Sequence, residues 1–244
     1  SRPPKLVVFD LDHTLIACDA TILWTEFLYE KKIVTDPIWR QYDRDMVKSY
    51  AKGVLDIRDF CRKHAGAFRS IPEEKLHALA QEFAKKKIAP LIFPDGKKWV
   101  KNALQANIPA CVLSASAAFI VKPIAKLFGL TDAMGIELAF KDGFCTGEIV
   151  GIPTFQEGKV ERLSQRLTEA GIGFEDVLFF TDSRNDLPLA ERAGYTVCVN
   201  PDAVLESAAR KNGWKVAEWK LSLRTQMTAQ VDAKGVPETQ TVRS

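Results

Sequence analysis

Four short motifs hold the side chains most able to do chemistry. They are FDLDHTL at residues 9–15, LSAS at 113–116, GKV at 158–160 and TDSRNDLP at 181–188. Together they supply the carboxylates of Asp10, Asp12, Asp182 and Asp186, the ammonium of Lys159, several hydroxyls and the amide of Asn185. Carboxylates gathered in one place repel one another and raise their pKa values unless a cation offsets the charge. Mg²⁺ prefers carboxylate oxygens together with water and phosphate, so the motifs predict a magnesium site beside a phosphate-binding lysine.

These motifs can act together only if the fold brings them to one place. Residues 5–9, 108–113 and 177–181 are short apolar runs that predict buried strands. Three of the motifs begin where these strands end, and parallel strands present their carboxyl ends at one edge of a sheet. Each motif taken alone is more often structural, because aspartates after a strand commonly cap helices or form turns. Their ordered occurrence at one predicted sheet edge favours a functional site.

The segments between the motifs predict an α/β protein. Residues 20–89 show helical spacing, with four candidate helices and no strand signal. After Pro94, helices alternate with strands, which indicates βαβ units and a mostly parallel sheet, and residues 136–149 predict a hairpin. We therefore expect a Rossmann-like α/β core at 1–17 and 90–219, an inserted all-helical cap at 18–89 and a polar, disordered tail at 220–244.

The four motifs in this order, DxDxT, a strand-terminal serine, a lysine and DSxNDxP, resemble those of the haloacid dehalogenase superfamily. The resemblance covers about residues 5–215 and is nearest to the phosphoserine-phosphatase-like branch, subfamily IB. It implies a helical cap inserted after the first strand of the core, and a Mg²⁺-dependent phosphoric monoester hydrolase. The family's dehalogenases lack a carboxylate two residues after the nucleophile, and its ion-pumping ATPases carry threonine there, whereas this chain carries Asp12.

The resemblance also implies a role for each matching residue. Asp10 would attack phosphorus as the nucleophile, and Asp12 would protonate the leaving oxygen and then deprotonate the attacking water. Asp10, the backbone carbonyl of Asp12 and Asp182 would bind Mg²⁺, and Asp186 would support the ion or its waters. The phosphoryl oxygens would be held by Ser114, Ala115, Lys159, Asn185 and backbone N–H groups after the nucleophile.

Substrate choice is less well defined by the sequence. Ala115 and Ser116 follow the serine where phosphoserine phosphatases usually carry two glycines, which predicts a more crowded pocket. Asp19 could bind a substrate ammonium or simply cap the following helix. An arginine for a substrate carboxylate has no clear position, and the candidate cap contacts are Arg58, Arg62, Arg69 and His64. We expect an amino-alcohol phosphate such as phosphoserine or histidinol phosphate.

Two other functions stay open. A phosphomutase or phosphotransferase would use the same aspartyl-phosphate chemistry but pass the phosphoryl group to another alcohol. A binding module without activity would keep the fold, yet it would have no need of an intact Asp10, Asp12 and Lys159.

Composition narrows the partners. A net charge of +3 without an arginine-rich run gives no reason to expect nucleic acid, and the longest weakly polar stretch, 108–121, is too short to span a bilayer. The five cysteines are scattered without a CxxC pair, which is typical of reduced thiols. We expect a cytoplasmic monomer or homodimer acting on a small phosphorylated metabolite, with neither membrane nor nucleic acid as partner.

Overall fold

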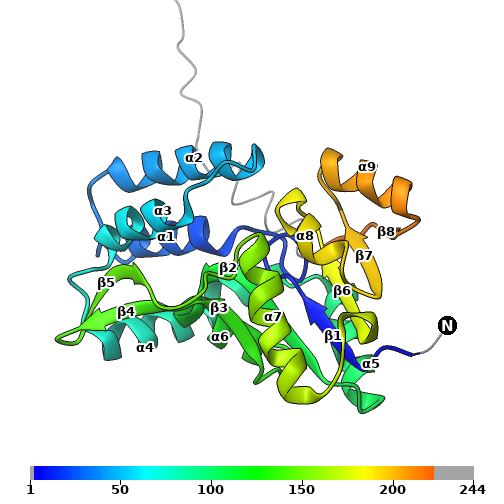
Figure 1. Ribbon diagram of the computed structural model, residues 1–244. Helices are drawn as coiled ribbons and strands as arrows, with labels where there is room; N and C mark the ends of the chain where they lie inside the picture. Colours follow the sequence, from blue (N-terminus) through cyan, green and yellow to red (C-terminus); the bar gives the residue numbers. More distant parts are fainter. Residues whose placement is uncertain (1–2, 223–244) are drawn as a thin grey trace, which may run out of the picture.

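A six-stranded parallel sheet forms the centre of the computed structural model, which describes residues 3–222 (Figure 1). The strand order is β3-β2-β1-β6-β7-β8, and each neighbouring pair is parallel. The strands are β1 (Leu6–Phe9), β2 (Ala110–Ala117), β3 (Ala133–Ile136), β6 (Val177–Thr181), β7 (Tyr195–Val199) and β8 (Lys215–Ala217). The predicted α/β class with a Rossmann-like parallel sheet is confirmed.

Strand β1 lies in the middle of this sheet because all four of its residues are apolar and buried. It pairs with β2 on one side and β6 on the other, and Phe9 lies beside both Val112 and Phe180. The Phe9 and Phe180 rings stack at 4.7 Å between centroids. This register places the chain segments that follow β1 and β6 next to each other at the carboxyl edge of the sheet.

Helices cover both faces of the sheet, as βαβ connections require. The helices of the core are α5 (Pro94–Gln105), α6 (Ala118–Lys126), α7 (Glu157–Ala170), α8 (Leu187–Ala190) and α9 (Ala203–Asn212), with short 3₁₀ turns η4 (Phe174–Asp176) and η5 (Arg184–Asp186). Helix α7 ends at Gly171, whose φ of 66° is the left-handed conformation that glycine adopts at helix ends.

An all-helical segment follows β1, as predicted. Its elements are α1 (Ala20–Glu30), α2 (Ile38–Ala51), α3 (Ile57–His64), η1 (Ala65–Ala67), α4 (Glu73–Phe83), the π-helical turn η2 (Ala84–Ile88) and η3 (Ala89–Leu91). Fully buried Trp24 on α1 packs edge-on against Phe83 of α4 and Phe119 of α6, with ring centroids 5.4 and 5.5 Å apart. This aromatic cluster joins α1 and α4 to the core. Helix α2 lies further out, at the upper left of Figure 1.

The predicted hairpin is present but shorter than expected. Strands β4 (Leu138–Lys141) and β5 (Phe144–Ile149) are antiparallel, and the turn between them is Asp142-Gly143 with both φ angles positive. The predicted first strand, 136–140, is wrong in extent, because Ile136 ends β3 of the central sheet. Glu137 separates Ile136 from β4, but one charged residue within a strand-like run does not show that the chain leaves one sheet for another.

Two further expectations need correction. Strand β2 was predicted to end at residue 113 but continues to Ala117, so Ser114 lies within the strand, where the pairing with β3 shifts register. Strand β8 was not predicted, because its three residues are half-buried or exposed and carry no apolar pattern. Of the tail expected at 220–244, residues 223–244 lie outside the described part. Across residues 3–222, no helix has the length and apolar character needed to cross a bilayer.

Candidate active site

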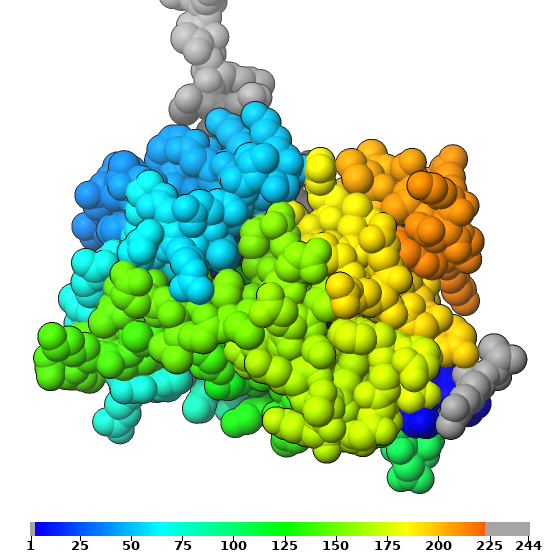
Figure 2. All heavy atoms as spheres, viewed as in Figure 1, coloured from blue at the N-terminus to red at the C-terminus, as the bar shows by residue number. Residues whose placement is uncertain are grey.

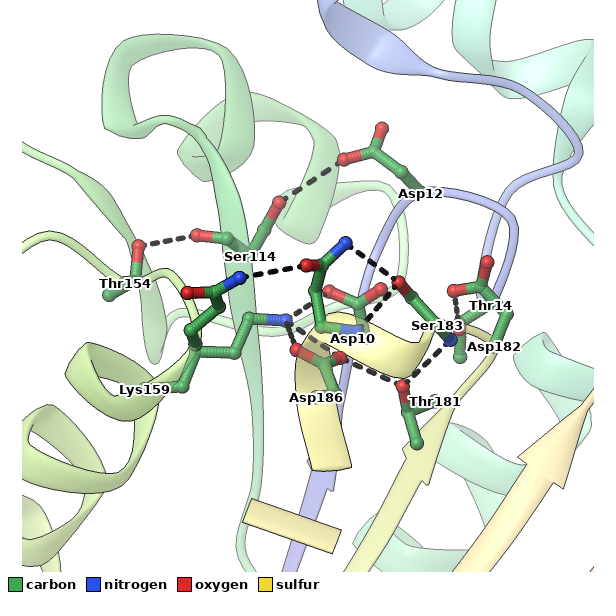
Figure 3. A network of polar contacts seen from close by, with 12 residues as sticks. Asp10, Asp12, Thr14, Ser114, Thr154, Lys159, Thr181, Asp182, Ser183 and Asp186 are labelled. Atoms are coloured by element: carbon green, nitrogen blue, oxygen red, sulfur yellow. Dashed lines mark hydrogen bonds and ion pairs between the residues drawn. The ribbon is translucent and has the colours of Figure 1, made fainter. Parts of the chain in front are cut away.

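A buried lysine joins two of the predicted carboxylates. Lys159, in the first turn of α7, places its Nζ 2.8 Å from Oδ1 of Asp10 and 2.8 Å from Oδ1 of Asp186 (Figure 3). Asp186 also accepts a hydrogen bond from the Thr181 hydroxyl at 2.8 Å. Lys159 and Asp186 are each 1% exposed. Burial alone would lower the pKa of Lys159, but the two carboxylates together raise it above its ordinary value, so this cation stays charged.

Asp10 is in turn close to a second carboxylate. Asp10 follows β1 and Asp182 follows β6, and the two side chains line the same cavity, near enough for the charge of Asp10 to act on Asp182. Thr14 donates to Asp182 at 3.0 Å. Burial, and then the charge of Asp10, raise the pKa of Asp182 well above its ordinary range. Burial also raises the pKa of Asp10 despite the charge of Lys159. The single lysine therefore does not offset all of the negative charge gathered here.

The Asp12 side chain points away from this pair, toward β2 and the start of α1 (Figure 3). It accepts hydrogen bonds from the Ser116 hydroxyl at 2.9 Å, the Ser114 hydroxyl at 3.3 Å and the Ala20 backbone N–H at 2.6 Å. Burial, with a further contribution from the charge of Asp19, raises the pKa of Asp12 to about 6. A carboxyl group with that pKa can both give and take a proton near neutral pH.

The chemistry of these donors fits a hard divalent cation. Asp10 and Asp182 bring two oxygen-rich side chains into contact, and the repulsion between them would fall if a cation lay between. Among residues 3–222, no three His, Cys, Asp or Glu side chains converge as a metal-binding group. A cation here would have the carboxylates of Asp10 and Asp182, and a backbone carbonyl, water and phosphate would have to complete its shell, since Asp186 is engaged by Lys159 and Asp12 by the serines. The ligand set stays a prediction.

Three of the residues expected to hold phosphate lie in β2 or just after β6. Ser114 is fully buried, and its backbone carbonyl accepts a hydrogen bond from Thr154 at 2.5 Å. Ala115 lines the cavity described below. The Asn185 amide donates to the Tyr50 backbone carbonyl at 2.9 Å. These positions bring hydroxyl, backbone and amide groups from three separate motifs to one edge of the sheet.

A cavity of about 210 Å³ lies above the carboxylates, beneath α2 and α3. Its floor is formed by Asp10, Asp12 and Asp182, and Asp19 lies on its wall. The helical segment contributes the roof, which is mostly apolar: Ile22, Met46, Val47, Tyr50, Ala51, Leu55, Ile57 and Phe60. Of the side chains in residues 3–222, those that line this cavity include neither lysine nor arginine.

Asp19 caps helix α1 and also lines the cavity. Its carboxylate accepts a hydrogen bond from the Ile22 N–H at 3.0 Å, so it is the N-cap of α1. It also lines the cavity, where burial raises its pKa. The interpretation of Asp19 as a helix cap is confirmed, and binding of a substrate ammonium stays a prediction.

The other specificity candidates lie outside the cavity. Arg62 points toward Glu148 of β5 at 3.8 Å, Arg58 toward the Gly151 carbonyl and Arg69 toward the Arg62 carbonyl. His64 is buried inside the helical segment, with its Nε2 3.0 Å from the Thr25 hydroxyl and 3.6 Å from Asp43. Burial lowers the pKa of His64 to about 4.

Sequence reasoning gave no role to several residues that the site uses. Ser116 is nearer to Asp12 than Ser114 is, and alternation along β2, which puts residues 114 and 116 on one face, could have indicated this. Gln156 and Tyr50 belong to none of the four motifs. They reach the site through side-chain contacts between the helical segment and the core, which no local pattern records.

A parallel sheet whose first strand is followed by acidic side chains and an inserted helical segment is the architecture of a Rossmann-like α/β protein with a helical insertion. The chain belongs to the haloacid dehalogenase-like hydrolase family, whose model matches residues 7–191. It is similar to a histidinol-phosphatase of Neisseria meningitidis, with 35% identity over 88% of this chain and 99% of that protein. A phosphoserine phosphatase of Mycobacterium tuberculosis is 27% identical over 88% of this chain and 70% of that protein.

Solved structures agree with this assignment. A Bordetella pertussis protein of unknown function superposes with a TM-score of 0.79 and 31% identity, over 88% of this chain and 98% of that one. A substrate-bound phosphoserine phosphatase shares the fold with a TM-score of 0.66 and 21% identity, over 94% and 99% of the two chains. The prediction of a phosphoric monoester hydrolase of the haloacid dehalogenase superfamily is confirmed.

Proposed function

We propose that this chain is a Mg²⁺-dependent phosphomonoesterase that hydrolyses a small amino-alcohol phosphate through a phospho-aspartate on Asp10. The main support is the position of Asp10. It is buried just after β1, is held by Lys159 at 2.8 Å, and lines the cavity together with Asp182. A carboxylate held in this way is a fixed nucleophile beside a fixed positive charge.

The residues present account for both halves of the reaction. An Asp10 oxygen attacks phosphorus, the bond from phosphorus to the ester oxygen breaks, and protonated Asp12 gives its proton to the leaving alkoxide. Water then attacks the phospho-aspartate as ionised Asp12 removes its proton, which releases phosphate and restores both carboxyl groups. Lys159 and the Asn185 amide hold phosphoryl oxygens throughout. Mg²⁺, held by Asp10, Asp182 and the Asp12 carbonyl, would supply further positive charge to the transferring group.

The lining of the cavity favours one substrate over another. Phosphoserine carries a carboxylate, which would face Asp10, Asp12 and Asp19 in a cavity where, among the described residues, His13 is the single basic side chain. Histidinol phosphate carries an ammonium and an imidazole and no carboxylate. Its ammonium would face Asp19, and its ring would lie against the apolar and aromatic roof that includes Phe60. The name of the similar Neisseria meningitidis protein points the same way.

Phosphate release from a panel of esters tests this proposal. With Mg²⁺ present, we expect kcat/KM for histidinol phosphate to exceed that for phosphoserine by at least about tenfold, and EDTA to abolish turnover. Phosphoserine turned over as well as histidinol phosphate would contradict the substrate assignment. Transfer of the phosphoryl group to a second alcohol without phosphate release would instead indicate a phosphotransferase.

Asp19→Asn tests the ammonium contact with a variant that keeps the helix. Asparagine is as good an N-cap as aspartate, so α1 should stay intact. We expect kcat/KM for histidinol phosphate to fall about 10- to 100-fold, because a charged hydrogen bond is lost. The control is p-nitrophenyl phosphate, which has no ammonium and should change by less than about twofold. Equal losses with both substrates would show that Asp19 acts through structure alone.

A further inference from the structure

Two amide side chains of the core hold the end of α2. Gln156 Nε2 donates to the Gly53 carbonyl at 3.2 Å and to Asn185 Oδ1 at 3.0 Å. Asn185 Nδ2 in turn donates to the Tyr50 carbonyl at 2.9 Å. We call residues 50–53 the cap turn. These hydrogen bonds connect the cap turn to residues that immediately adjoin the candidate phosphate site.

The rest of this contact is small and mostly polar. The Tyr50 ring packs on Phe155 at 5.8 Å between centroids. The Arg184 side chain lies against Gly53. In contrast, α1 and α4 are joined to the core by the buried Trp24 cluster. Figure 2 shows the blue atoms of the helical segment meeting the green and yellow atoms of the core along this boundary.

Gln156 has an unusual backbone that fixes where its side chain can point. Its φ of 48° and ψ of −125° lie in a region that non-glycine residues rarely adopt. The turn is tight, because a Cβ atom added to Gly158 would come within 1.9 Å of the Pro153 carbonyl oxygen. The same turn begins α7, so Gln156 is held three residues before Lys159. Glycine would adopt this conformation more readily, yet the chain places there a residue with two amide donors.

We propose that Gln156 is a positioning residue that couples the phosphate-binding amide of Asn185 to the cap turn. This inference deepens the proposed function and rests on it, because it takes Asn185 as a phosphate contact. The donor from Gln156 helps to fix the Asn185 amide with its oxygen toward Gln156 and its nitrogen toward the Tyr50 carbonyl and the Ser183 hydroxyl. A phosphoryl group bound at Asn185 therefore tightens the network that holds the cap turn down.

Phosphate binding and closure of the cap turn should stabilise each other. Binding that orders the Asn185 amide stabilises the contacts at Gly53 and Tyr50, and closure of the cap turn orders the amide for binding. Without the Gln156 donors, the Asn185 amide loses the partner of its oxygen and is held through its nitrogen alone, and the cap turn loses one of its hydrogen bonds to the core. Opening of the cap turn should then become more frequent and independent of phosphate.

Three variants separate this role from a structural one. Gln156→Met keeps the length of the side chain and removes both donors. Gln156→Gly also removes the donors but relieves the positive φ, so its thermal midpoint should equal or exceed that of the wild type. Gln165→Met is the matched control, since Gln165 is an exposed glutamine on the same helix, α7.

Hydrogen exchange at the cap turn is the measurement, with inorganic phosphate and Mg²⁺ as the added ligands. The N–H groups of Gly53 and Val54 donate to the Tyr50 and Ser49 carbonyls, so their exchange reports opening of the turn. We expect about tenfold faster exchange there in Gln156→Met and Gln156→Gly, and wild-type rates in Gln165→Met. Phosphate should slow this exchange severalfold in the wild type and in the control, and leave both Gln156 variants unchanged.

Wild-type exchange rates in both Gln156 variants would overturn the proposal, as would equal protection by phosphate in all the proteins. Steady-state kinetics with histidinol phosphate give a second readout. In both Gln156 variants, loss of the coupling should raise KM about tenfold, whereas kcat should fall by a smaller factor. Failure of this inference is distinguishable from failure of the proposed function. Exchange without phosphate tests the contacts at the cap turn alone, whereas a wild type that hydrolyses none of the esters would refute the phosphatase assignment.

Discussion

Replacing Lys159 with methionine should destabilise the folded protein severely. The side chain is 1% exposed, and its ammonium lies 2.8 Å from both Asp10 and Asp186. Methionine keeps most of the buried volume, so the main effect is to leave two buried carboxylates without their cation. Breaking a buried ion pair from one side costs about 3–5 kcal/mol in the free energy of unfolding.

Urea unfolding followed by tryptophan fluorescence measures this cost. The fully buried Trp24 should provide a large change in signal. All samples should contain EDTA, so that no metal ion can offset the unpaired charge. The control is Lys63→Met, which breaks an exposed pair with Asp59 on one turn of α3 and should cost about 0.2–0.5 kcal/mol.

A second substitution distinguishes charge from packing. Adding Asp186→Asn to Lys159→Met removes one of the unpaired charges while an asparagine oxygen can still accept from Thr181. The double variant should recover part of the lost stability, on the order of 1–3 kcal/mol. A loss below about 1 kcal/mol in Lys159→Met, or no recovery in the double variant, would refute the view that Lys159 balances these carboxylates.

Three other predictions concern pH, metal and packing. Burial raises the pKa of Asp43 to about 7, with the charges of Asp19 and Glu26 adding to the rise and Arg44 opposing it. The folded protein therefore holds a proton on Asp43 that the unfolded chain has lost, and the free energy of unfolding decreases as pH rises from about 4 to about 7. Asp43→Asn should therefore gain stability relative to the wild type between pH 5 and pH 8 in urea unfolding. Mg²⁺ should raise the thermal midpoint of the wild type and not that of Asp182→Asn. Gly158→Ala should cost more than about 2 kcal/mol in urea unfolding, because its Cβ would meet the Pro153 carbonyl.

Each of the predictions on pH, Mg²⁺ and Gly158 has a control variant or an outcome that would contradict it. Asp45→Asn, an exposed site on the same helix as Asp43, should show the pH dependence of the wild type. Parallel pH curves for Asp43→Asn and the wild type would contradict the buried-carboxyl argument. An Asp182→Asn protein that Mg²⁺ stabilises as fully as the wild type would exclude Asp182 as a ligand. Gly171→Ala is the comparison, because open space surrounds Gly171 and only its positive φ opposes the new side chain, so it should cost less than Gly158→Ala.

Much of the fold could be predicted because local pattern and burial agree. The apolar runs around Val8 and Phe179 are buried on both faces of a central parallel sheet, and such strands have an unmistakable sequence pattern. The helices of the inserted segment likewise follow their capping residues, as at Asp19 and Asp56. The predicted ends of strands were wrong where pairing with a distant strand determines them. Strand β2 continues through Ser114 to Ala117 because β3 pairs with it there, and no local propensity records that pairing.

The site was predictable to a similar extent. Asp10, Lys159 and Asp186 come from three distant segments, and their meeting follows from the rule that ligands bind at the carboxyl edge of a parallel sheet. That rule does not predict the contacts that polar side chains make between one helix or strand and another. Ser116 and Gln156 are examples, since their neighbours are set by the rotation of one element against another. The positions of Arg62 and His64 outside the cavity depend on the packing of α3 in the same way.

The phosphorylation of Asp10 is the central claim, and trapping the intermediate tests it most directly. Enzyme mixed with histidinol phosphate and Mg²⁺ should be quenched in acid within one turnover, digested and analysed by mass spectrometry. We predict a phosphoryl group on the peptide that contains Asp10, localised to that carboxyl by borohydride reduction, and none in Asp10→Asn. Turnover without a phosphorylated peptide, or a phosphoryl group on another residue, would contradict the account.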